Sequence, residues 1–161
     1  MVNVLVNTLV AFLIGGATLS FNFKAVDASG EEVYNGKGEI VTLGEKYRME
    51  TDDVVVASDG KVMCIYQKGA DELVLQGVDA AGGDIMANPF ALLQNGGGGV
   101  YKITTGGSDS KGFPKEIFLK AKSGALYTIQ ILGYSANPLP DSKLFTLSAE
   151  DFPTAYVTDM R

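Results

Sequence analysis

The chain has 161 residues, of which 46% are hydrophobic, and its 13 basic and 19 acidic side chains give a formal net charge of −6. A chain of this length can bury roughly 70% of the surface that its unfolded form exposes, so we expect one folded domain over residues 1–161 and not a disordered chain. The acidic balance argues against a nucleic-acid-binding protein, which needs a basic stripe, and against electrostatic attachment to an anionic membrane.

The sequence offers little material for catalysis or metal binding. It contains no histidine, which removes the commonest general base and the commonest transition-metal ligand. The single cysteine, Cys64, lies between Met63 and Ile65 in a predicted strand, and we interpret it as a buried, inert thiol. Asp52 and Asp53 are adjacent, so on a strand they point to opposite faces and cannot form a catalytic dyad. We therefore expect a protein that is not an enzyme and that uses neither a cofactor nor a metal.

The uncharged segment Val2–Ile14 allows three interpretations. A signal peptide begins with a basic region, and residues 1–20 contain no Lys or Arg. A membrane span needs about 20 apolar residues, and the pair Gly15-Gly16 interrupts this one too early. The third interpretation, which we favour, is an N-terminal amphipathic helix over residues 1–15, because its apolar side chains recur at helical spacing.

After Gly16 the period of the sequence changes from helical to alternating. Leu19, Phe21 and Phe23 alternate with polar side chains, which predicts a strand with one apolar face. The dipeptide Asp59-Gly60 predicts a hairpin turn. Further strands are predicted at 31–43, 46–51, 54–57, 62–67, 72–78, 100–104, 115–120, 125–132, 144–147 and 155–158. We expect an antiparallel meander.

One segment interrupts the predicted strands. Residues 84–94 fit a short internal helix that begins near Asn88-Pro89 and ends at a glycine run over residues 95–99. That run is not followed by a helix or by Lys-Ser/Thr, so we interpret it as a connector and not as a phosphate-binding loop.

These elements predict a mainly β fold with few helices, of the α+β class. A long sheet with one apolar face must bury that face. We expect a strongly curved antiparallel sheet, or unclosed β-barrel, whose concave apolar face is covered by the helices 1–15 and 84–94. Its bulky and flexible side chains either line an adaptable apolar cavity or fill an ordinary core, and the apolar pattern alone favours the filled core.

Several short motifs occur in an order that resembles a known family. They are the strand with Phe21 and Phe23, the extended stretch Gly36–Gly38, Lys46–Glu50, Ser58–Lys61 leading to Tyr66, Asn88-Pro89-Phe90 with Leu92-Leu93, and Asp159-Met160-Arg161. In this order and spacing the chain resembles the periplasmic outer-membrane lipoprotein carrier proteins (LolA-like), in the divergent form common in Bacteroidetes-type bacteria.

The resemblance implies a carrier that shields the acyl chains of a lipoprotein, or of a related lipid, in a hydrophobic cavity and performs no covalent chemistry. It implies a periplasmic location after removal of a signal peptide. It also implies an inner-membrane lipoprotein-releasing transporter as donor and an outer-membrane acceptor. We expect a monomer. The alternative is a cell-envelope structural or interaction domain of the same fold, with a filled core or a different lipophilic ligand.

We expect apolar side chains on the concave side to line the cavity. These are Phe21, Phe23, Tyr47, Met49, Met63, Ile65, Leu73, Met86, Phe90, Leu93, Ile117, Leu119, Tyr127 and Ile129. In the family an early arginine bonds the covering helix, and the resemblance gives that lid contact to Arg48. Met63 and Cys64 stand where the family usually has aromatic side chains.

Overall fold

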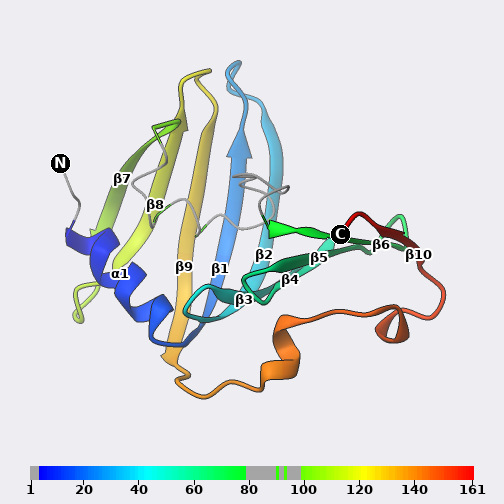
Figure 1. Ribbon diagram of the computed structural model, residues 1–161. Helices are drawn as coiled ribbons and strands as arrows, with labels where there is room; N and C mark the ends of the chain where they lie inside the picture. The colour runs from blue at the N-terminus through cyan, green and yellow to red at the C-terminus, as the bar shows by residue number, and fades with distance from the viewer. Residues whose placement is uncertain (1–3, 79–89, 91–92, 94–98) are drawn as a thin grey trace.

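The computed structural model of the protein describes residues 4–78, 90, 93 and 99–161. In this part of the chain ten strands form one sheet, in the order β10-β6-β5-β4-β3-β2-β1-β9-β8-β7 (Figure 1). Neighbouring strands are antiparallel except for β6 and β10, which run parallel. Because β7 and β10 are the two edges, the sheet is not closed, and the predicted unclosed, mainly β fold is confirmed.

Most strands lie within a few residues of their predicted positions. Their bounds are Ala17–Val26 (β1), Glu32–Leu43 (β2), Lys46–Thr51 (β3), Val54–Ser58 (β4), Val62–Gln67 (β5), Glu72–Gly77 (β6), Tyr101–Ser108 (β7), Pro114–Ala121 (β8), Leu126–Ala136 (β9) and Tyr156–Asp159 (β10).

The sheet changes direction between its two halves. In Figure 1 the strands β7, β8, β9, β1 and β2 stand upright side by side, whereas β3 to β6 and β10 lie across them toward the right of the view. Gly38 of β2 helps at this bend, because a Cβ atom there would lie 2.7 Å from Cζ of Phe21. The missing side chain lets the Phe21 ring lie over β2.

The helix α1 (Val4–Ile14) covers one face of this sheet, where it contacts β1, β2, β7 and β8 (Figure 1). Val6, Leu9 and Leu13 are buried, as their helical spacing predicts. None of the helices in the described part of the chain has the length and apolarity that a membrane crossing requires. The predicted internal helix 84–94 falls outside the described residues, apart from Phe90 and Leu93.

The segment between β9 and β10 corrects one prediction. Residues 144–147 are not a strand, because a 3₁₀ turn, η2 (Ser142–Phe145), occupies the first part of this stretch. The side chain of Asp141 accepts a 3.0 Å hydrogen bond from the Lys143 backbone N–H, which starts the turn. A second 3₁₀ turn, η3 (Ala149–Asp151), begins with a cap in which the Ser148 backbone N–H donates to the Asp151 carboxylate at 2.8 Å.

The sheet buries apolar side chains on both faces. The larger group, which we call the inner-face cluster, joins α1 to side chains from β1–β5, β8 and β9. The smaller group, the outer-face cluster, joins β4, β5 and β6 to Leu147, with Phe152 packed against it. Cys64 belongs to the outer-face cluster and is 4% exposed, which confirms the prediction of a buried thiol, and burial raises its pKa. The C-terminal segment therefore covers one arm of the sheet from outside.

Candidate functional site

The inner-face cluster contains most of the side chains that the sequence nominated. Twelve of them lie there, ten buried and two partly buried. They are Phe21, Phe23, Tyr47, Met49, Met63, Phe90, Leu93, Ile117, Leu119 and Ile129, with Ile65 and Tyr127 packed against them. Met86 lies outside the described residues. These side chains come from β1, β3, β5, β8 and β9, together with Phe90 and Leu93.

Aromatic rings link the strands along this inner face. Phe23 of β1 stacks on Tyr127 of β9 with ring centroids 6.0 Å apart, and Tyr34 of β2 lies 6.0 Å from Phe23 on the other side. Tyr101 of β7 meets Tyr127 edge to face at 5.8 Å. Phe21 and Phe90 form a similar edge-to-face pair at 5.2 Å. The cluster thus presents broad apolar surfaces.

Tyr34 and Tyr101 were not among the nominated residues. Tyr34 has the same orientation as Gly36 and Gly38, so the nearest apolar residue on this face of β2 is Ile40, six positions further along the chain. Tyr101 lies at the start of β7, directly after the glycine-rich stretch, where the alternation is too short to assign a face.

A second aromatic group fixes α1 against the sheet. Phe12 contacts Phe113 and Tyr134, with ring centroids 5.1 Å and 5.6 Å away. The Tyr134 hydroxyl donates a hydrogen bond to the Asp109 carboxylate, and this bond raises the pKa of Tyr134 to about 12. Asp109 also accepts from the backbone N–H groups of Lys111 and Phe113, at 2.9 Å each, so the turn that positions Phe113 is itself held in place.

Leu73 does not join the inner-face cluster. It is fully buried in the outer-face cluster, on the same side of the sheet as Val55 and Leu147. In β6 the apolar run Leu73, Val74, Leu75 is continuous, so alternation could not say which member faces inward, and Val74 is the one that pairs with inward-facing Ile65.

Arg48 also lies on the outer face, because its neighbours Tyr47 and Met49 point inward. Its guanidinium donates to the carbonyl oxygen of Leu144 at 3.4 Å, so the contact that the structure describes is with the C-terminal segment and not with a helix over the inner face. The alternation of Tyr47, Arg48 and Met49 along β3 is enough to predict that Arg48 lies on the outer face.

The chemistry available to the inner face is burial of apolar surface. The ionisable groups of the inner-face cluster and of the side chains packed against it are all phenols, those of Tyr34, Tyr47, Tyr101, Tyr127 and Tyr134. Within the described ranges, no three side chains among Cys, Asp and Glu come close enough to hold a metal ion. The arrangement suits an apolar ligand.

The fold was compared with known proteins. No family's sequence profile matches the chain, and no curated protein sequence is significantly similar. Among solved structures, a LolA superfamily protein from Nitrosomonas europaea superposes with a TM-score of 0.57 at 9% identity, covering 90% of this chain and 99% of that one. An uncharacterized conserved protein from Thermus thermophilus superposes with a TM-score of 0.53 at 9% identity, covering 96% of both chains. The chain therefore has a LolA-like fold.

Proposed function

We propose that this protein is a periplasmic carrier that shields the acyl chains of lipoproteins, or of a related lipid, against the inner face of its sheet. In this function it takes its cargo from an inner-membrane lipoprotein-releasing transporter and gives it to an outer-membrane acceptor. No covalent step is involved. The proposal combines the apolar inner-face cluster with the LolA-like fold.

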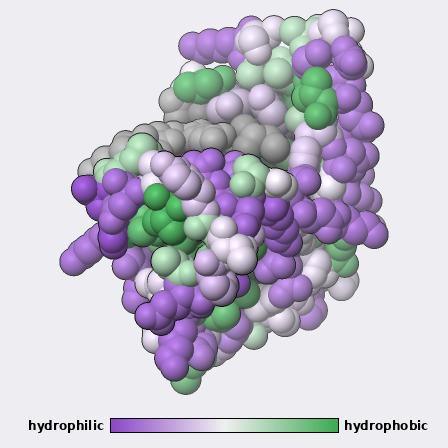
Figure 2. Space-filling model, turned by 90° about the vertical axis from the view of Figure 1, so that its right-hand side faces the viewer, coloured by the Kyte–Doolittle hydropathy of each residue, from purple (hydrophilic) through white to green (hydrophobic). Residues whose placement is uncertain are grey.

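The observation that carries the proposal is the extent of the apolar inner-face cluster. The inner-face cluster extends over seven strands and is covered by α1, which has no charged side chain. Figure 2 shows one side of the molecule as mostly hydrophilic, with only small hydrophobic patches. Each methylene of an acyl chain that moves from water into such a cluster contributes about 0.8 kcal/mol. A long chain is therefore held by its length, without a specific polar contact.

Entry of an acyl chain requires the inner-face cluster to open. Leu9, Leu19 and Ile117 are 0% exposed, so the cover must separate from the sheet before a guest reaches them. α1 is the described element that lies over this face. Separating α1 from the sheet costs free energy. This cost is offset when the acyl chain makes apolar contacts with the sheet in place of those of α1.

A fluorescent fatty acid tests the proposal directly. The folded protein should bind the probe saturably, with a blue shift of its emission, and palmitate and a diacylated lipopeptide should displace it. The non-acylated form of the same peptide should not displace it. Absence of binding by every acyl ligand, in protein whose circular dichroism shows the folded sheet, would exclude the carrier function. Osmotic-shock fractionation of expressing cells tests the periplasmic location.

A second candidate is a cell-envelope interaction domain with a filled core. The nearly complete burial of the inner-face side chains favours it. The two candidates differ in the response of α1 to acyl ligands. A carrier should show faster hydrogen exchange at α1 backbone amides when a lipopeptide is added, whereas a filled-core domain should show no change.

A further inference from the structure

The C-terminal segment, residues 138–161, lies across the outer face of the sheet and buries few of its side chains. In Figure 1 it leaves the lower end of β9, passes below β3, β4 and β5, and returns to pair with β6 as β10. Phe145 and Leu147 are its only buried side chains. Among the described residues no ion pair connects the segment to the sheet, because the Arg161–Asp159 pair lies within it. A small set of local contacts therefore holds it in place.

The start of this segment is fixed to the sheet independently of its far end. The Asn137 backbone N–H donates to the Gly16 carbonyl oxygen at 2.8 Å, and the Asn137 side-chain amide donates to the Thr18 hydroxyl at 3.3 Å. Pro138 and Pro140 follow, and neither has an N–H with which to continue the pairing of β9. A change of backbone direction after Asn137 therefore leaves β9 in the sheet.

The far end of the segment is held at Asp71, in the turn between β5 and β6. The Asp71 carboxylate accepts hydrogen bonds from the Tyr66 hydroxyl at 2.6 Å and from the Thr154 hydroxyl at 2.7 Å. The Asp71 carbonyl oxygen accepts from the Tyr156 backbone N–H at 2.9 Å. Apart from glycines, Asp71 is the one described residue with a positive φ, +49°. This left-handed conformation, which most side chains avoid, lies at the residue that supplies two acceptors to the segment.

Between its two ends the segment covers the outer-face cluster. The Cys64 thiol donates to the Leu147 carbonyl oxygen at 3.5 Å, and Phe152 stacks on Tyr66 with ring centroids 3.8 Å apart. Tyr66 thus contacts the segment through its ring and Asp71 through its hydroxyl. Loss of the contacts at Asp71 therefore also loosens the Phe152 contact, which couples the middle of the segment to its end.

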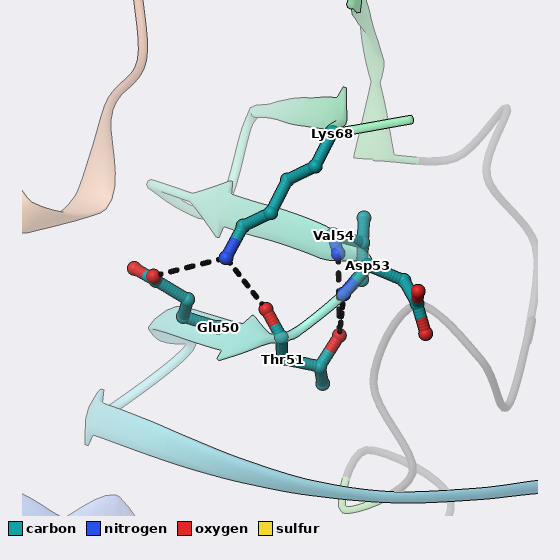
Figure 3. A network of polar contacts seen from close by, with 5 residues as sticks. All are labelled: Glu50, Thr51, Asp53, Val54 and Lys68. Carbon is teal, nitrogen blue, oxygen red and sulfur yellow. Dashed lines mark hydrogen bonds and ion pairs between the residues drawn. The ribbon is translucent and has the colours of Figure 1, made fainter. Parts of the chain in front are cut away.

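The strands beneath the segment have contacts of their own. Figure 3 shows Lys68 reaching between Glu50 and Thr51, with Nζ 3.2 Å from the Glu50 carboxylate and 2.7 Å from the Thr51 carbonyl oxygen. The Thr51 hydroxyl in turn accepts from the backbone N–H groups of Asp53 and Val54, at 3.2 Å each. This network joins the ends of β3 and β5 to the start of β4 and includes no residue of the C-terminal segment. These strands can therefore stay paired when the segment leaves.

We propose that the C-terminal segment is a strap that opens as one unit about Asn137 while β1–β9 stay folded, and that Asp71 is the residue that holds it closed. Segments with few buried contacts open at a lower free energy than the whole domain. β10 adds only four residue pairs to β6, in the less stable parallel arrangement, so it should separate once the contacts at Asp71 are lost. Opening uncovers the outer-face cluster and the edge of β6, on the opposite face of the sheet from the proposed acyl site.

Cys64 is the only cysteine in the chain, so a thiol reagent reports the uncovering of the outer-face cluster. We expect dithionitrobenzoate to label the folded protein at least about tenfold faster than the global unfolding equilibrium allows. The labelling rate should change little with urea below the unfolding transition, because opening the strap exposes little surface. A labelling rate that follows global unfolding at every urea concentration would overturn the strap.

Thr154→Val and Ser29→Ala are matched variants, because each removes an exposed hydroxyl that donates to an aspartate in a turn. Thr154→Val should speed the labelling of Cys64 about three- to tenfold, although the Cys64 thiol bonds to Leu147 and not to Thr154. Ser29→Ala should leave the rate unchanged, since Ser29 bonds to Asp27 in the turn between β1 and β2. Equal rates in the two variants would overturn the role of Asp71.

Hydrogen exchange distinguishes opening as one unit from fraying of the chain end. The backbone N–H groups of Tyr156 and Met160 donate to the carbonyl oxygens of Asp71 and Leu75. Both amides should exchange with the same opening equilibrium that the labelling of Cys64 gives. An opening equilibrium for Met160 more than about tenfold larger than that for Cys64 would show fraying from the end, and would overturn the proposal.

Discussion

The hydroxyl of Thr42 on β2 donates a 2.6 Å hydrogen bond to the carbonyl oxygen of Leu13 at the end of α1. The last carbonyl groups of a helix lack partners within the helix, so this buried bond satisfies one of them. The Gly44 N–H does the same for Ile14, at 2.8 Å. The C-terminal end of α1 is thereby fixed to the turn between β2 and β3.

Replacing Thr42 with valine should destabilise the protein by about 1–3 kcal/mol, because the Leu13 carbonyl loses its buried donor while the side-chain shape is kept. Urea unfolding measures the change. Thr42→Ser keeps the hydroxyl and should lose less. Equal unfolding midpoints for Thr42→Val and the original protein would show that the bond does not stabilise α1.

Phe90 and Phe152 offer a comparison of the two faces. Phe90 packs edge to face on Phe21 in the inner-face cluster, whereas Phe152 stacks on Tyr66 with centroids 3.8 Å apart on the outer face. Truncation of a packed phenylalanine to alanine costs up to about 3–5 kcal/mol. Both variants should therefore melt earlier, but only Phe90→Ala should weaken fatty-acid binding at a temperature where both are folded. Equal loss of binding in the two variants would mean that stability alone governs it.

The Asp109–Tyr134 pair should make stability depend on pH at both extremes. The hydrogen bond from Tyr134, followed by that from the Phe113 N–H, lowers the pKa of Asp109 below 3.8. Its contribution is thus present above pH 3.8 and is lost as the pH falls further. The pKa of Tyr134 rises from 10.0 to about 12, so its contribution is present below pH 10 and is lost between pH 10 and about 12.

Tyr134→Phe isolates this effect, because it removes the hydroxyl and keeps the ring on Phe12. The stability difference between the two proteins should be constant near neutral pH and should shrink in both outer windows. Urea midpoints measured across the pH range give this difference. A difference that does not vary with pH would contradict the role of the hydrogen bond.

Gly16 and Gly30 both have positive φ angles, +100° and +90°, but their surroundings differ. A Cβ atom at Gly16 would lie 2.4 Å from the Asn137 carbonyl oxygen, whereas nothing lies within 4 Å of one at Gly30. Gly30→Ala should cost about 1 kcal/mol, from backbone strain alone. Gly16→Ala should cost at least about 2 kcal/mol, because the close contact adds to the strain. Urea unfolding of the two variants separates the cost of backbone strain from the cost of the steric contact. Equal losses of stability in both variants would contradict the contact at Gly16.

The sequence predicted the strands well where one face was apolar and the other polar. Leu19, Phe21 and Phe23 show this pattern, and all three are buried on the inner face of β1. The pattern failed in β6, because Leu73 and Val74 are adjacent and both apolar, so alternation could not assign either to a face. The 3₁₀ turn in the covering segment could not be foreseen, because the apolar residues around Leu144 fit an extended strand as well as a turn.

The position of Arg48 follows from its own strand and not from the resemblance. The family resemblance suggested a contact with a covering helix, while the local alternation with Tyr47 and Met49 placed it on the other face. Two physical facts decide its position: β3 is a regular strand, and its inward positions are taken by the two apolar side chains. The sequence also did not predict that β10 pairs with β6 in parallel, because the two strands are far apart along the chain.

The position of β1 in the middle of the sheet has a consequence for how the chain folds. β1 pairs with β2 through a short turn, but also with β9, where Ala17 lies opposite Ala136. The strands from β1 to β6 and those from β7 to β9 can each assemble from neighbouring hairpins, and a single distant ladder must then join them. Such non-local pairing is slow, so this joining step should limit the folding rate. Until β9 has been synthesised, β1 remains an unpaired edge where association with another nascent chain would begin.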